Sequence, residues 1–521
     1  MNEVLKEHLG EIALLIYILY PLLKRWWDRT KRKGEQSGKS PNKAARTPEP
    51  KQAPPSPPTA RPTRAPQPAP TLPHAPRPTE ADLLAAAQTQ LERLKRDATE
   101  RLLRAEDDPR LLRLAPAFRD DLLGRLETIE RSLRSRPTLS TIVQDTAVLR
   151  GLESLLRHLN TIALRRTHRG SPFLGTADAM ADACYAPILD FVRIHGLELS
   201  TSQPVVVPGD WERSIVPRFA STRVAPLRVP SDFDSDVWRW PAIAHEVAHD
   251  FYYSLKGLDR RLHDRLGLPE QVESPTSSQG LDGAWLRKLF GAWLPEIFAD
   301  AMGTLLLGPA HVEAMRRSLR NPDSAQRTAA IFQANGRIDE HPPARLRLYM
   351  ASRVLHHLGR HTEAETLWDQ WESEHPEVRF YYLPLGGQWV GLSDEALHSI
   401  ADSLIDALVR DGWPELDGFQ LLEIAGLAYF HAEHAEVERL AGLLARGQAV
   451  DGDVRWIMAA AVLAATAQPA LHDQILDAAR RSIARVGSKE SAGEPSKPDG
   501  RTHRRIGKAL VRSLGRAART R

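Results

Sequence analysis

A proline-rich stretch near the start of the chain limits what this sequence can fold into. Residues 41–78 hold 14 of the 39 prolines in the 521-residue sequence, in runs such as PPSPPTARPTRAPQPAP. A segment of this composition cannot bury a core and favours an extended spacer of polyproline character. We therefore expect residues 35–79 to be a disordered linker that separates the N-terminus from the folded body. Its proline pairs leave a second interpretation open, in which the stretch binds a partner.

The segment before the linker is apolar and is followed by basic residues. Residues 12–23 carry no charge, and Trp26 and Trp27 extend the run toward the ~20 residues that span a bilayer as a helix. Six Lys and Arg residues lie between positions 24 and 33, whereas three glutamates precede the apolar run. By the positive-inside rule, we expect residues 1–34 to form a single-pass anchor in the inner (cytoplasmic) membrane, with the body in the cytoplasm. The alternative is a helix that lies on the membrane or packs onto another domain.

The composition of the chain limits which partners it can bind and which residue types can hold a metal ion. The chain is 42% hydrophobic and 26% charged, with a net charge of +4, as is typical of globular proteins. This charge is small for the length and is concentrated at the two ends, so we expect no specific nucleic-acid binding. The single cysteine, Cys184, fits a reducing compartment and excludes a cysteine-rich zinc site. Any metal would therefore be held by His, Asp or Glu.

The remainder of the chain is mainly α-helical in pattern. Apolar residues recur at three- and four-residue spacing in residues 80–199, which we expect to be a helical domain, and again in a C-terminal helical domain at 351–484. The second of these faintly resembles helical-hairpin repeats. The tail at 485–521 is basic, and contact with anionic lipid is the alternative to solvated disorder there.

The region between the helical domains contains the clear strand signals and the motif that points to chemistry. QPVVVPGD (203–210) and STRVAPLRVP (221–230) are β-branched runs bounded by Pro and Gly, which predicts two short strands. We expect residues 200–350 to form one core domain that contains a small β-sheet.

The stretch IAHEVAHDFY (243–252) predicts a metal-binding helix. His245 and His249 are four residues apart and so share one helix face, where both imidazoles can reach one metal ion. Glu246 lies beside them, in a position to act as a general base toward a water molecule that the metal activates. Asp250 departs from the uncharged residue usual at its position. Two surface histidines one turn apart would give the same pattern, so the motif needs supporting context.

A second helix offers the third metal ligand. Residues 294–308, LPEIFADAMGTLLLG, are apolar apart from two acids, Glu296 and Asp300, that share one face. Acids in so apolar a segment are costly to bury without partners. We therefore predict that Glu296 ligates a zinc ion with the two histidines and that Asp300 orients a ligand histidine from behind. Ordinary salt bridges between helices are the alternative.

These motifs resemble those of the gluzincin metallopeptidases. The resemblance rests on His245, Glu246 and His249 followed by the E-x-x-x-D helix. It is nearer to the branch that contains the CAAX prenyl endopeptidases and the membrane-bound heat-shock proteases. It covers about residues 200–350 and implies a zincin-like core, a Zn²⁺ cofactor and a peptide or protein substrate. That branch has several membrane spans, whereas this chain has one weak apolar segment.

The same branch has a later His-Pro element followed by arginine, which EHPPARLRL (340–348) resembles. We expect His341 to donate a hydrogen bond to the oxyanion of the transition state, and Arg345 to orient His341 or bind substrate. In the alternative interpretation, the two prolines only begin the next helix.

Three functions remain open at the level of sequence. The best supported is a membrane-tethered zinc peptidase with Glu246 as general base. The alternative is a non-catalytic, membrane-tethered scaffold, in which the zinc site is structural or vestigial and the helical domains bind partners. A metal-dependent hydrolase of another bond is the third. Glu246 separates the first two, because a structural site has no use for a base.

Overall fold

The computed structural model describes a mainly helical protein between residues 78 and 491. It leaves out residues 103–108, 136, 169–171, 198, 200–202, 210–223, 231, 256, 270–280, 321–324, 335–336, 377 and 386–387 within this range. The predicted anchor (1–34), nearly all of the predicted linker (35–79) and residues 492–521 of the basic tail lie outside the described residues. A mainly α-helical fold with a small β-sheet is confirmed, whereas the zincin-like core stays a prediction.

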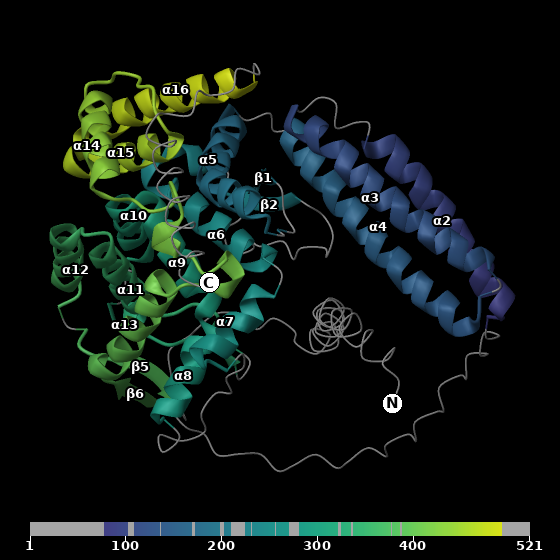
Figure 1. Cartoon of the computed structure of the whole chain (residues 1–521), viewed down its shortest axis with the longest axis horizontal. Coiled ribbons are helices and arrows are strands. Elements are labelled where there is room, and N and C mark those ends of the chain that lie inside the picture. Colours follow the sequence, from purple (N-terminus) through teal and green to yellow (C-terminus); the bar gives the residue numbers. More distant parts are fainter. Residues whose placement is uncertain are drawn as a thin grey trace, which may run out of the picture. The chain divides into compact units, whose positions relative to one another are not determined.

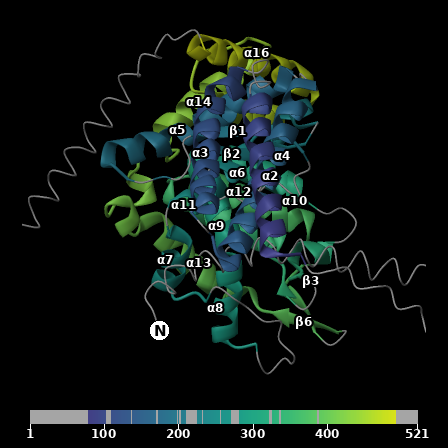
Figure 2. The same cartoon turned by 90° about the vertical axis from the view of Figure 1, so that its right-hand side faces the viewer.

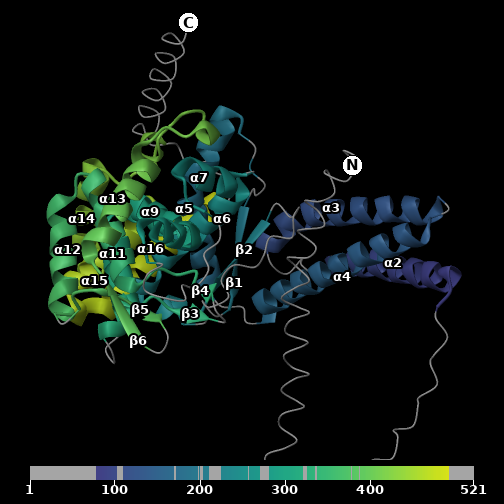
Figure 3. The same ribbon diagram turned by 90° about the horizontal axis from the view of Figure 1, so that it is seen from below.

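Three long helices at the start of the described part pack around a hydrophobic cluster of their own. Helices α2 (Glu80–Leu102), α3 (Pro109–Arg134) and α4 (Leu139–His168) lie side by side (Figures 1 and 3). Their buried side chains recur at alternating spacings of three and four residues, which places them on one stripe of each helix. These residues are Ala87, Leu91, Leu94 and Ala98 in α2, Leu122, Leu126, Ile129 and Leu133 in α3, and Ile142, Leu149, Leu152 and Leu156 in α4.

A second hydrophobic core extends from residue 173 to residue 483. It includes α5 (Pro172–His195), which the sequence places in the first helical domain, and it joins the segments expected as separate domains at 200–350 and 351–484. The other helices are α6 (Ala242–Ser254), α7 (Leu258–Leu266), α8 (Gly283–Ala292), α9 (Leu294–Leu307), α10 (Pro309–Leu319), α11 (Ala344–His357), α12 (His361–Glu374), α13 (Asp394–Arg410), α14 (His431–Ala445), α15 (Val454–Ala467) and α16 (His472–Ser491).

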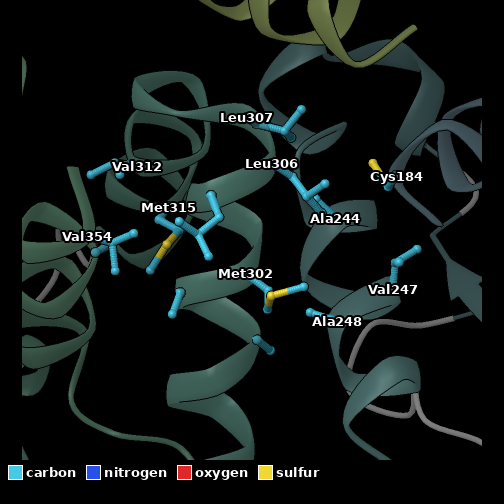
Figure 4. Close-up of a cluster of buried hydrophobic side chains, with 14 of the residues drawn as sticks. Cys184, Ala244, Val247, Ala248, Met302, Leu306, Leu307, Val312, Met315 and Val354 are labelled. Atoms are coloured by element: carbon cyan, nitrogen blue, oxygen red, sulfur yellow. The ribbon is translucent and has the colours of Figure 1, made fainter. Parts of the chain in front are cut away.

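Helices α6 and α9 form the centre of this core. Their contact surface contains small and flexible apolar side chains: Ala244 and Ala248 of α6 lie next to Met302 and Leu306 of α9, whereas Val247 points to the other side of α6 (Figure 4). Thirteen of the fourteen residues of α9 are buried, as expected for a helix that is apolar on nearly all sides. The close packing fixes the position of the polar residues that these two helices carry.

No single helix among the described residues is both long and apolar enough to cross a membrane. Helices α8 and α9 pass that test of length and composition only as a pair, and the pair is bent by 64°.

The two predicted strands are present, and two further pairs were missed. Strands β1 (Gln203–Pro208) and β2 (Val224–Val229) pair in parallel. Strands β3 (Gln333–Ala334) and β4 (Arg337–Ile338) pair antiparallel, as do β5 (Tyr381–Leu385) and β6 (Gln388–Leu392). The segment at 351–484, expected as a helical domain, therefore also contains the strands β5 and β6. A Gly-Gly pair between two runs rich in aromatic residues was the available hairpin signal.

The junction between α9 and α10 depends on one glycine. Gly308 has φ 59° and ψ −139°, a conformation that residues with a Cβ rarely adopt. A Cβ at this position would lie 2.4 Å from Cδ1 of Tyr429. The backbone N–H of Tyr429 in turn donates to the carbonyl of Leu305, at 2.8 Å. Gly308 therefore lets a remote segment of the chain approach the end of α9.

Replacing Gly308 by Ala should lower the free energy of unfolding by about 3 kcal/mol or more, because backbone strain and a clash with Tyr429 act together. Gly359→Ala is the matched control, since Gly359 has φ 73° but open space where the Cβ would be. It should cost only about 1–2 kcal/mol, the strain alone. Urea unfolding of the full-length variants measures both values. Equal losses would show that contact with Tyr429 does not matter.

Candidate metal centre

The two histidines of the motif converge on one point from helix α6. The helix begins after Pro241, and its apolar residues are buried on the sides that face α5 and α9. His245 and His249 lie one turn apart, and their Nε2 atoms are 3.0 Å from each other. Two imidazole nitrogens so close require a proton or a cation between them, because both carry lone pairs in the direction of approach.

Glu296 of α9 completes a group of three potential ligands. Its Oε1 lies 3.1 Å from Nε2 of His249, and its Oε2 lies 3.5 Å from Nε2 of His245. One ligand atom from each of the three residues falls within 4.8 Å of the others. Tetrahedral zinc with bonds of about 2.0–2.1 Å sets its ligand atoms about 3.3 Å apart, so the observed spacing fits such an ion.

A buried oxygen of the cluster that lacks a hydrogen-bond partner also suits a bound cation. The buried Oε2 of Glu296 has no hydrogen-bond partner among the described residues. A buried carboxylate oxygen without a partner is costly, and a metal ion bound between the three side chains would satisfy it. Two imidazoles and one carboxylate with an open fourth position form a donor set typical of catalytic zinc.

Asp300 lies behind the cluster and holds one of the histidines. Its Oδ1 is 2.9 Å from Nδ1 of His245, which leaves Nε2 of that ring directed at the ligand group. A carboxylate in this position would fix the tautomer and the orientation of the ring if His245 ligated a metal, which stays a prediction. Asp300 is only 1% exposed. Burial alone would raise its pKa, but Arg347 and His245 hold the pKa well below its usual value.

Arg347 of α11, which was not predicted, pairs with Asp300. Its Nε and one terminal nitrogen donate to the two carboxylate oxygens of Asp300, at 2.7 and 2.8 Å. The same terminal nitrogen lies 3.6 Å from Oε2 of Glu296. Burial alone would lower the pKa of Arg347, but the nearby carboxylates raise it, so the guanidinium stays charged. The bidentate contact holds Asp300 ionised and in place.

Arg345 does not take the part expected of it. It is buried and pairs with Glu372 and Asp394, at 2.9 and 2.8 Å. Residues two apart on a helix point about 200° from each other, so Arg345 faces away from the cluster when Arg347 faces toward it. Arg347, two residues further along α11, is the arginine of this segment that reaches the cluster.

His341 lies beside the cluster, and its side chain is 60% exposed. Its Nε2 is 3.6 Å from Oε1 of Glu296, and its Nδ1 is 2.9 Å from Oδ1 of Asp339. The hydrogen bond with Asp339 raises the pKa of His341, while partial burial opposes the rise. The buried indole of Trp293, directly before α9, donates to the carbonyl of Asp339 at 2.9 Å. His341 is therefore held to the start of the helix that carries Glu296.

Glu246 and Asp250 lie on a different side of α6 from the ligand histidines. Glu246 is 7% exposed, and its side chain leaves the helix about 100° round the axis from that of His245. Its charge contributes to the raised pKa of Arg347, so the carboxylate is near the cluster.

Asp250 accepts a hydrogen bond of 2.6 Å from the hydroxyl of Tyr185 in α5. The unusual acid of the motif therefore serves the packing of α5 on α6.

Three residues near the centre escaped sequence reasoning. Arg347 lies in α11, so a helical projection could have suggested it, whereas Asp339 precedes the helix and gave no such signal. His311 of α10 carried no signal: it is buried, burial lowers its pKa to about 4, and the charges of Asp300, His245 and Arg347 act on it. Its ring occupies the space beside Gly303 on α9.

Comparison with protein-family models, curated proteins and solved structures finds no match for this chain. The chemistry of the centre is therefore inferred from its own geometry.

The three predicted ligands should be needed for metal binding. The full-length protein should bind about one zinc ion, and His245→Ala, His249→Ala or Glu296→Ala should abolish binding, since each removes one of three ligands. Glu246→Gln should keep the metal. Mass spectrometry of the bound metal measures this, with His356→Ala, a histidine on the surface of α11, as the control. Full zinc content in the Glu296 variant would reject the third ligand.

Zinc binding should release a proton from His245. Burial alone would lower the pKa of His245, but the neighbouring carboxylates of Asp300 and Glu296 raise it to about 10, so the metal-free ring is protonated at neutral pH. Zinc requires the neutral ring, so the affinity should rise with pH, by about tenfold per unit between pH 6 and 8.

Calorimetry in two buffers that differ in protonation enthalpy counts the released protons. Asp300→Asn removes one cause of the raised pKa of His245 and should release fewer protons. It should also weaken zinc binding by about 10- to 100-fold, because the ring loses its orientation. An affinity that does not change with pH would contradict the assignment.

Proposed function

We propose that this chain is a membrane-tethered, zinc-dependent peptidase of the gluzincin type. The observation that carries the proposal is the convergence of His245, His249 and Glu296 within 4.8 Å, with Glu246 adjacent on α6. The resemblance of the two motifs to the CAAX prenyl endopeptidase and membrane heat-shock protease branch supports the same conclusion. The tether rests on the apolar and proline-rich segments at the N-terminus.

The residues around the cluster have separate parts in this proposal. When bound, zinc would lower the pKa of a water molecule toward about 7 and polarise a carbonyl group. Glu246 would accept the proton from the attacking water and then donate it to the leaving amine. Asp300 and Arg347 would keep His245 oriented, and so maintain the geometry on which the reaction depends.

His341 would stabilise negative charge that develops on the carbonyl oxygen. Asp339 occupies Nδ1, so Nε2 is the atom left to face the reacting group, at the accessible side of the cluster. The raised pKa of His341 favours the ring with N–H on both nitrogens, and that form can donate from Nε2. Asp339 would thus have the positioning role that the sequence assigned to Arg345.

Replacing Glu246 by Gln tests the function. Cells that contain the wild-type protein should show protein fragments with new termini, and cells with the Glu246→Gln variant should lack them, because amide cannot act as a general base. Quantitative mass spectrometry of protein termini measures this. His245→Ala should give the same result by losing the metal. Identical termini in wild type and in a zinc-loaded Glu246→Gln variant would favour the scaffold instead.

A further inference from the structure

Four short backbone segments form one layer that ends at the candidate metal centre. Strands β5 and β6 pair antiparallel, and β5 is linked on its other side to residues 330–332, through a parallel bridge between Ala330 and Tyr382. That segment continues into β3, which pairs with β4. These strands lie side by side in Figures 2 and 3. The backbone N–H of Asp339, directly after β4, donates to the carbonyl of Phe332 at 2.9 Å.

The outer face of this layer is aromatic. Tyr382 lies opposite Gly391, and Pro384 lies opposite Trp389, so these side chains share one face. Phe380 belongs to the same face, because its side chain lies 3.7 Å from the Cβ position of Gly391. We call Phe332, Phe380, Tyr382, Pro384 and Trp389 the aromatic platform.

Phe332 joins the platform through the alternation of the strand. It lies two residues beyond Ala330, the bridge partner of Tyr382, and so faces the same way. Its neighbour Ile331 is 1% exposed and points into the core, whereas Phe332 is 43% exposed. Tyr381 and Leu383 of β5 are likewise buried on the inner face.

The exposure of the platform is unusual for a sheet surface. Trp389 is 60% exposed and Phe380 is 50% exposed. The solvent face of an antiparallel pair is normally polar, and contiguous exposed apolar side chains mark interaction sites. Tyr382 is partly buried against the core, but a core function does not account for the exposed rings of Phe332, Phe380 and Trp389.

We propose that the aromatic platform binds an extended apolar segment of the polypeptide that the candidate metal centre cleaves, and this inference rests on the proposed function. Along β5 the platform side chains recur every second residue, about 6.6 Å apart, which is the spacing at which an extended peptide presents side chains on one face. The layer is continuous with the centre, because Asp339 at its end contacts His341, whose Nε2 lies 3.6 Å from Glu296.

Charge argues against an anionic lipid surface as the occupant. Residues 380–392 contain no Lys or Arg, and Arg379 alone directly precedes them. Lipid-binding surfaces combine apolar side chains with clustered Lys and Arg, which these strands lack. A polypeptide with alternating apolar side chains needs no such cluster.

Peptide binding to an inactive protein tests the proposal separately from catalysis. Full-length, zinc-loaded Glu246→Gln protein is titrated against a fluorescein-labelled peptide with alternating Leu and Phe, and against the same peptide with Ser in their place. The apolar peptide should bind more tightly. Trp389→Ser and Phe332→Ser should each raise its Kd by about tenfold or more, as expected for exposed aromatic anchors that become buried on binding. Val143→Ser is the control, since Val143 is 57% exposed on α4.

The outcomes distinguish this proposal from the function on which it rests. Weaker binding by both platform variants, without hydrolysis by the wild type, would keep the platform and reject the peptidase. Hydrolysis of the apolar peptide with unchanged KM and Kd in both variants would keep the peptidase and overturn the platform. The platform is equally overturned if Trp389→Ser leaves peptide binding intact but reduces binding to phosphatidylglycerol vesicles or converts a dimer to a monomer. Thermal unfolding confirms that each variant is folded.

Discussion

The ion pair between Asp300 and Arg347 is the interaction on which the candidate centre depends. An isolated carboxylate in the middle of an apolar helix would be protonated or exposed, because the protein interior does not solvate charge. The two hydrogen bonds from Arg347 keep it charged, and the charged form holds the Nδ1 side of His245. Removal of one partner from such a buried pair typically costs about 3–5 kcal/mol, so the pair links the metal site to the stability of the fold.

The fourteen residues of helix α9 combine the apolar side chains that pack on α6 with the two acids of the candidate centre. Its apolar side chains pack on α6 and set the distance between the two helices, while its two acids lie four residues apart on one side. Trp293, directly before the helix, holds the segment that contains Asp339 and His341. Packing, ligation and positioning are therefore properties of one element, and a shift of α9 would disturb all three.

The sequence identified the residues whose spacing or setting is unusual. His245 and His249 are recognisable because a helix places residues four apart on one face, and Glu296 and Asp300 because acids are rare in apolar segments. The choice between Arg345 and Arg347 required knowledge of which side of α11 faces α9, and this follows only from tertiary packing. His311 is a single histidine in an ordinary helix, so nothing local distinguishes it.

The domain boundaries show a similar limit. Changes in composition predict a linker, but the helices beyond residue 351 bury their apolar faces in the same core as α6 and α9. A sequence pattern reports that a helix has an apolar face and does not report which partner covers it. The hairpin of β5 and β6 was missed for a different reason, since its short strands were outweighed by the helical patterns on either side.

The contact between Gly303 and His311 has a consequence for how this protein can vary. Three ring atoms of His311 lie within 2.4–2.9 Å of where a Cβ on Gly303 would be, so the ring occupies the volume that any larger residue at position 303 would need. A residue larger than glycine fits at position 303 only if a smaller residue replaces His311 at the same time. Because Asp300 lies one turn away on α9, a larger residue at position 303 alone would displace the candidate metal centre. In related sequences, substitutions at the two positions should therefore occur as pairs.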